Sequence, residues 1–196
     1  MYNSTSENTR IKTIPSPGFS CLMISLFRKY LTLNFVPWRE TDHNGIDIYC
    51  RDVFRSTTLD LEGAASFYWI AKSIIDGSGS DKQVQIVLRC KRKADLVFEY
   101  KRESDGQMVA YLAINKEDLT IPFRFPIRQY NKFDEDGQKV TKIIQSGLGA
   151  FAKALDEYLT RNGADDKSNK LPVNFNEYQE YSKQVSFSEV WYNPQL

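Results

Sequence analysis

The sequence predicts an α+β fold in which two antiparallel four-stranded sheets are each followed by one helix. Three observations support this prediction. Apolar and polar residues alternate in eight short segments, as in half-buried strands. At two places the apolar residues instead recur every three or four positions, as in a helix that buries one face. The order of four strands and one helix occurs twice. Because neither half can bury much apolar surface alone, we expect the halves to pack as one pseudo-twofold domain.

Four strands are expected in the first half. They cover residues 20–27, 30–36, 46–54 and 56–61. An Asn-Gly turn signal lies between the second and the third strand. Pro37 is expected to end the second strand, because proline cannot donate a hydrogen bond to a sheet ladder.

The first helix is expected to follow the fourth strand almost directly. In the stretch STTLDLEGAASFYWIAKSI, Thr57, Leu59 and Leu61 alternate with polar neighbours. From Ala65 onward the apolar residues recur at helical spacing, and Trp69 falls in this stripe, which indicates a core position. The sequence DGSGS then supplies a helix stop and a linker.

The second half repeats this order. Strands are expected at 83–91, 94–102, 108–115 and 119–127, followed by a polar loop. A helix is then expected within residues 139–163, because Val140, Ile143, Ile144, Leu148 and the apolar residues that follow them have helical spacing.

The two repeats define the expected domain organisation. Residues 1–18 are expected to form a flexible N-terminal arm. Residues 19–163 form the main domain, with repeats at 19–76 and 82–163. The remaining segment, 164–196, has no sustained period and combines a net charge of −2 with six aromatic residues, so we expect an acidic, aromatic C-terminal tail.

Composition excludes several classes of function. The chain has one histidine, His43, in a polar run, and three widely spaced cysteines, Cys21, Cys50 and Cys90. It has no phosphate-binding loop and no metal-ligand spacing. We therefore expect a non-enzymatic protein without catalytic residues, metal or cofactor. We expect no membrane segment, and an intracellular location, cytoplasmic or nucleoid-associated. The Ser- and Thr-rich N-terminus leaves an organellar location open.

Basic residues are concentrated in one region, although the net charge of the whole chain is only +1. Between Lys82 and Arg102 seven basic residues stand against Asp95 and Glu99, which gives a local charge of +5. Cations at a hairpin end can neutralise phosphates and release counterions. The alternative is a solvated turn that protects an edge strand from aggregation.

A second region combines basic and aromatic residues on polar strand faces. An aromatic ring on such a face can stack on a base, which contributes about 1–3 kcal/mol without sequence preference. The stretch PFRFPIRQY adds further arginines and aromatics, although Phe123 and Phe125 also fit core positions. The candidate nucleic-acid-binding residues from both regions are Arg28, Lys29, Tyr30, Trp38, Arg39, Tyr49, Arg51, Arg89, Lys91, Arg92, Lys93, Lys101 and Arg102.

Three stretches of the chain resemble the Whirly family. They are LFRKYLTLNFVP, the strand-to-helix stretch STTLDLEGAASFYWIAK, and LVFEYKRESDGQMVAYLAINKEDLTIPF. The resemblance covers roughly residues 19–163 and rests on the tandem order of elements. It implies a Whirly-like fold within a superfamily of single-stranded nucleic-acid-binding proteins, which includes positive-cofactor-type coactivators. It also implies a homo-oligomer.

The expected function is therefore binding of single-stranded DNA, as an accessory of replication, recombination or transcription. One alternative is RNA binding by the same fold. Another is a structural or protein-interaction module that uses the aromatic C-terminal tail to contact a partner. The third is an enzyme with an unrecognised site, which would need acidic residues around one cleft.

Overall fold

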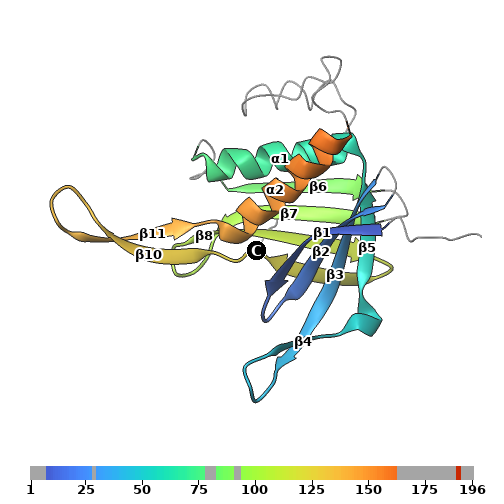
Figure 1. Cartoon of the computed structure of the whole chain (residues 1–196), viewed down its shortest axis with the longest axis horizontal. Coiled ribbons are helices and arrows are strands. Elements are labelled where there is room, and N and C mark those ends of the chain that lie inside the picture. Colours follow the sequence, from blue (N-terminus) through green and yellow to red (C-terminus); the bar gives the residue numbers. More distant parts are fainter. Residues whose placement is uncertain (1–7, 28–29, 78–82, 91–93, 163–188, 191–196) are drawn as a thin grey trace, which may run out of the picture.

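The computed structural model describes residues 8–27, 30–77, 83–90, 94–162 and 189–190. Within these residues the chain is a sheet-rich α+β protein with antiparallel sheets and two α-helices (Figure 1). The expected fold class is thereby confirmed at this level. The strands are more numerous than the sequence predicted, because each five-stranded sheet gains a strand from outside the two repeats and a separate two-stranded sheet forms within the second repeat.

The first sheet has five strands in the order β1-β2-β3-β4, with β5 also paired to β3. Strand β3 is long enough to hold two partners along one edge. Its first half pairs with β5 and its last residues pair with β4. The elements are β1 (Asn8–Ser16), β2 (Ser20–Phe27), β3 (Tyr30–Thr41), β4 (Asp47–Tyr49), the short 3-10 helix η1 (Arg51–Val53) and β5 (Arg55–Leu59).

The expectation that Pro37 ends its strand is wrong. Strand β3 continues to Thr41, because the missing N–H falls where β3 changes partner from β5 to β4. The carbonyl of Pro37 accepts a hydrogen bond from the backbone N–H of Cys50 at 2.8 Å, and Trp38 donates to Phe19 on the opposite side at 2.9 Å. A proline is tolerated at such a break in a ladder.

The prediction of a flexible arm over 1–18 is also corrected, since Asn8–Ser16 form strand β1. This strand pairs with β2 along its whole length, and Ile14 is buried in the core. The sequence of this segment is too polar for a strand to be predicted from it. The strand is stabilised by pairing with the apolar strand β2. Residues 1–7 lie outside the described part of the chain.

The second sheet has the order β12-β6-β7-β8-β9. Four of its strands match the sequence prediction: β6 (Val84–Cys90), β7 (Ala94–Arg102), β8 (Met108–Lys116) and β9 (Leu119–Arg124). The fifth, β12 (Glu189–Val190), comes from the C-terminal tail and pairs with β6. Residues 163–188 and 191–196 of the tail lie outside the described residues.

Residues 139–144, the expected start of the second helix, instead form one strand of a β-hairpin. Strands β10 (Arg128–Phe133) and β11 (Lys139–Ile144) pair antiparallel, and α2 (Ser146–Arg161) begins only after them. The helical prediction for 139–144 is therefore wrong. The turn explains the difference, since Asp134 accepts hydrogen bonds from the backbone of Asp136 and Gln138, and Gly137 has a φ of 75°.

One hydrophobic core combines residues of both halves. Helices α1 (Leu61–Ile75) and α2 pack against each other. Aromatic rings from both helices and from the second sheet contact one another in this core. Phe67 contacts Phe98 and Phe151, with ring centroids 6.2 Å apart in each pair. Phe123, Phe125 and Trp69 are also buried, so their core interpretation is confirmed.

The β1–β2 turn fixes the first sheet to the edge of the second. The Ser16 hydroxyl donates to the carbonyl of Arg124 at 2.7 Å, and the Ser20 hydroxyl donates to that of Pro122 at 2.8 Å. In Figure 1 the strands of the first sheet run steeply across those of the second. This attachment leaves the face of the first sheet that points away from the core open.

Candidate nucleic-acid interface

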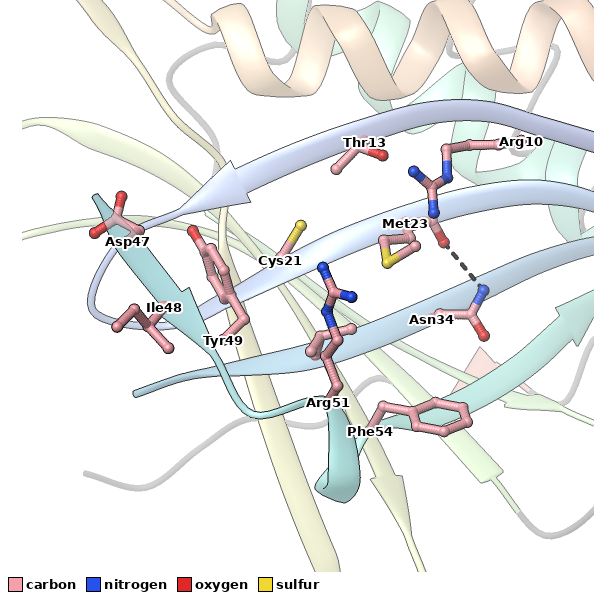
Figure 2. Close-up of a pocket in the computed structure, with 11 residues that line it drawn as sticks. Arg10, Thr13, Cys21, Met23, Asn34, Asp47, Ile48, Tyr49, Arg51 and Phe54 are labelled. Carbon is pink, nitrogen blue, oxygen red and sulfur yellow. Dashed lines mark hydrogen bonds between the residues drawn. The ribbon is translucent and has the colours of Figure 1, made fainter. Parts of the chain in front are cut away.

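The open face of the first sheet carries a hollow of about 700 Å³, here called the sheet-face hollow (Figure 2). Strands β1 to β4, the 3-10 helix η1 and the residue after it all contribute side chains to it. The lining residues are Arg10, Thr13, Cys21, Met23, Asn34, Val36, Asp47, Ile48, Tyr49, Arg51 and Phe54.

The floor of the sheet-face hollow follows from strand alternation. Leu22, Leu33 and their alternate neighbours face the core with no exposed surface. The residues between them face the hollow, and the pairing places Met23 opposite Asn34 and Cys21 opposite Val36. The floor is therefore uncharged and partly polar.

The wall of the hollow comes from the connection between β3 and β5. Because β3 extends beyond β5, its last residues hold β4, and the chain returns through η1. Figure 2 shows the side chain of Arg51 reaching over the strands of the floor, with Tyr49 on one side of it and Phe54 on the other. Phe54 is 49% exposed, so its ring is open to a ligand.

Two guanidinium groups give the hollow its charge. Arg10 lies on β1 and Arg51 on η1, and within the described residues neither forms an ion pair. Asp47 is the acidic residue of the lining. Its Oδ1 atom accepts hydrogen bonds from Trp38 Nε1 at 3.2 Å and from the Thr41 hydroxyl at 2.7 Å. The two arginines therefore remain available to an anion.

The phenol of Tyr49 and the thiol of Cys21 are uncharged near pH 7. Burial and the charge of Asp47 raise the pKa of Tyr49 to about 12. The hydroxyl lies beside the backbone of Ser16, outside hydrogen-bond geometry. Burial also raises the pKa of the Cys21 thiol, although the charge of Arg10 opposes the shift. Tyr49 thus offers an uncharged ring, and Cys21 is a poor nucleophile.

The structure brings together some of the candidates from the first half. Tyr49 and Arg51 line the sheet-face hollow. Trp38 does not line it but donates a hydrogen bond to Asp47, which does. Arg39 is exposed and lies 3.7 Å from Glu40. Tyr30 is half-buried at the first residue of β3 and does not line the hollow.

Lys101 and Arg102 lie on the other sheet and are engaged locally. Lys101 Nζ lies 2.9 Å from Glu99 Oε2 and 5.1 Å from the centre of the Tyr111 ring. Arg102 donates to the carbonyl of Gly106 at 2.8 Å. Both side chains support the β7–β8 hairpin and do not line the hollow.

The remaining candidates fall outside the described structure. Arg28, Lys29, Lys91, Arg92 and Lys93 are not among the described residues. The backbone of Arg89 lies in strand β6 opposite Asp95, and its side chain is not described.

Sequence reasoning missed Arg10, Asn34 and Phe54. Arg10 fell in the expected flexible arm, and Phe54 was taken as the end of a strand. Asn34 alternates with buried residues along β3, as Tyr30 does, and this alternation is the signal in the sequence that could have identified it.

Comparison with models of known protein families gives no match, and no curated protein matches the sequence. Within the described residues, no three histidine, cysteine or acidic side chains are grouped to hold a metal ion. Neither described helix has the length and apolar character needed to cross a membrane.

Proposed function

We propose that this protein binds single-stranded nucleic acid, with DNA favoured over RNA, and performs no catalysis on it. The sheet-face hollow carries the proposal. Arg10 and Arg51 line the same hollow as the rings of Tyr49 and Phe54, over an uncharged floor.

The chemistry of these groups suits an unpaired strand. Guanidinium groups bind phosphate oxygens, and aromatic rings stack on bases whose faces are free. In a duplex the base faces are already stacked, so Tyr49 and Phe54 would have no partner. The hollow therefore favours single strand over duplex.

The proposal includes a Whirly-like relationship between the two halves and assembly as a homo-oligomer. Both are implied by the resemblance to the Whirly family, which rests on the tandem order of elements described above. Several copies would raise the effective concentration of weak contacts along one strand.

Fluorescence anisotropy with labelled oligonucleotides tests the function. We expect oligo-dT to bind with an affinity that falls steeply with salt, and duplex to compete poorly. The variant Arg10→Gln/Arg51→Gln should lose roughly a hundredfold or more in affinity, since it removes two charged groups and a hydrogen bond to each contributes about 1.5–3 kcal/mol. Lys153→Gln, an exposed change on α2, is the matched control.

Equal binding to duplex, or no binding at 50 mM salt, would contradict the proposal. A loss in the control as large as in the double variant would mean that general charge, and not the hollow, explains the affinity. An RNA of the same length in the same assay decides between the two nucleic acids.

A further inference from the structure

The β10–β11 hairpin projects from the body of the protein (Figure 1). All six residues of β10 are exposed, and five of the six in β11 are exposed. A two-stranded hairpin with both faces in water gains little from burial. Its exposed surface is therefore free to contact a partner.

The charges on this hairpin are separated by position. The strands carry four cations and no acidic residue, and within the described residues these cations form no ion pair. The acidic residues lie in the turn. They are Asp134, Glu135 and Asp136.

The strand register places three of the four cations on one face. Tyr130 pairs with Lys142, Arg128 with Ile144 and Lys132 with Val140. Residues directly opposite in an antiparallel pair, and every second residue along a strand, share a face. Arg128, Tyr130, Lys132 and Lys142 therefore form one basic face, while Lys139 lies on the other.

The hairpin is anchored at its base. The carbonyl of Pro126 accepts hydrogen bonds from the hydroxyl of Ser146 at 3.0 Å and from the N–H of Gly147 at 2.7 Å. Gln145 Nε2 donates to the carbonyl of Met108 at 2.7 Å. Both strand ends are thus attached to the body, which gives the basic face a defined position.

We infer that the basic face of the β10–β11 hairpin is a second contact for the same single-stranded nucleic acid, and this inference rests on the function proposed above. Along the hairpin the three cations recur about every 6.6 Å, because Lys142 lies opposite Tyr130, between Arg128 and Lys132, and such a row can follow a phosphate backbone. Tyr130 lies between Arg128 and Lys132 in this row and offers its ring, 47% exposed, to a base. Unpaired cations without neighbouring acids on the strands complement a polyanion better than a protein surface of mixed charge.

The test compares oligo-dT of about 10 and about 30 nucleotides on the full chain. The 10-mer is short enough to occupy the sheet-face hollow alone, whereas the 30-mer can reach both surfaces. In Arg128→Gln/Lys132→Gln/Lys142→Gln we expect the 30-mer to lose roughly tenfold or more in affinity at low salt. The slope of log affinity against log salt should fall by about 2, since each neutralised phosphate contributes about 0.7 on a single strand. Binding of the 10-mer should change less than twofold.

Two variants of the same hairpin serve as controls. Lys139→Gln removes a cation from the opposite face and should leave the slope unchanged. Glu135→Gln/Asp136→Asn removes two acids from the turn and keeps Asp134, which holds the turn. It should strengthen 30-mer binding slightly. Circular dichroism and thermal unfolding check that each variant is folded.

The outcomes separate this inference from the proposed function. If the triple variant binds the 30-mer like wild type, the inference is overturned while binding at the hollow stands. A triple variant that binds normally but changes its sedimentation would show that the hairpin contacts a second copy, which also overturns the inference. If only the triple variant loses binding and Arg10→Gln/Arg51→Gln does not, the hairpin stands and the hollow fails as the site. If the wild type binds neither oligonucleotide, both the proposed function and the inference about the hairpin are overturned.

Discussion

Arg124 and Glu103 form a bidentate ion pair between strand β9 and the turn that follows β7. Nε of Arg124 lies 3.0 Å from Oε1 of Glu103, and Nη2 lies 2.9 Å from Oε2. The hydroxyl of Tyr111 donates to the same carboxylate. Arg124 stands among the arginines and aromatics of PFRFPIRQY, yet its charge is used to hold the second sheet together.

Glu103→Gln should lower the free energy of unfolding at pH 7 by about 1–2 kcal/mol, since the pair is bidentate but partly exposed. The hydrogen bonds from Arg124 lower the pKa of Glu103 from its ordinary 4.5, and the hydrogen bond from Tyr111 adds a smaller lowering. Burial of the carboxylate raises the pKa but does not outweigh them. A carboxylate with a lowered folded pKa contributes stability above its unfolded pKa, and the contribution is lost as the pH falls through the folded value. The difference between wild type and variant should therefore shrink below pH 4.5.

Urea unfolding at pH 7, 4.5 and 3 measures this difference. Glu117→Gln is the matched control, because Glu117 lies 3.8 Å from Arg55 but its side chain is 69% exposed. It should cost little at any of these pH values. Equal costs for the two variants would show that the Glu103 pair has no special role.

Gly147→Ala should destabilise the protein by roughly 1–3 kcal/mol. A Cβ atom on Gly147 would lie 2.6 Å from the backbone nitrogen of Pro126, so α2 or the base of the β10–β11 hairpin must move. Gly149→Ala in the same helix is the control, since nothing lies within 4 Å of its Cβ position. It should be neutral or gain up to about 1 kcal/mol, because alanine favours helix. Urea midpoints rank the two variants, and a Gly147→Ala protein as stable as Gly149→Ala would contradict the close packing.

Three turns show how far the sequence predicted the strands. In each, a Gly with positive φ donates its N–H to the carbonyl of a residue three positions earlier: Asp42, Glu103 or Asp134. The Gly signals at the first two turns correctly indicated hairpins. The third has the same signal, but the apolar spacing from Val140 onward favoured a helix. Pairing with β10 decides the conformation, and Ile143 and Ile144 are both exposed as a result.

The sheet-face hollow was only partly predictable. Alternation indicated that Tyr49 and Arg51 share a polar strand side, and both line the hollow. Arg10 reaches it only because β1 pairs with β2, a long-range contact that local composition does not encode. Phe54 reaches it because η1 turns the chain back, and a short 3-10 helix leaves no periodic signal.

Tyr49→Phe should reduce the amount of folding free energy that the protein loses as the pH rises above 9. The pKa of Tyr49 is raised to about 12, first by burial and then by Asp47. A group with a raised folded pKa contributes stability below its unfolded pKa near 10, and this is lost as the pH rises through 12. The variant cannot ionise here, so between pH 9 and 11.5 it should lose about 1 kcal/mol less than wild type, allowing for solvent screening. Urea midpoints across this range measure the effect, with Tyr130→Phe on the exposed hairpin as control. Parallel curves for wild type and Tyr49→Phe would argue against a buried phenol.

Phe54→Ser should weaken binding of oligo-dT by roughly tenfold, because one aromatic stack on a base contributes about 1–3 kcal/mol. Phe54 lines the sheet-face hollow and is 49% exposed, so its loss should not change the urea midpoint. Val53→Ser is a closely matched control. Val53 is the preceding residue and 45% exposed, but it does not line the hollow.

Anisotropy titrations at one salt concentration compare the two variants. Because stacking involves no charge, Phe54→Ser should leave the salt slope unchanged, whereas Arg10→Gln/Arg51→Gln should lower it. Equal losses in the two single variants would place the bound strand elsewhere on the protein.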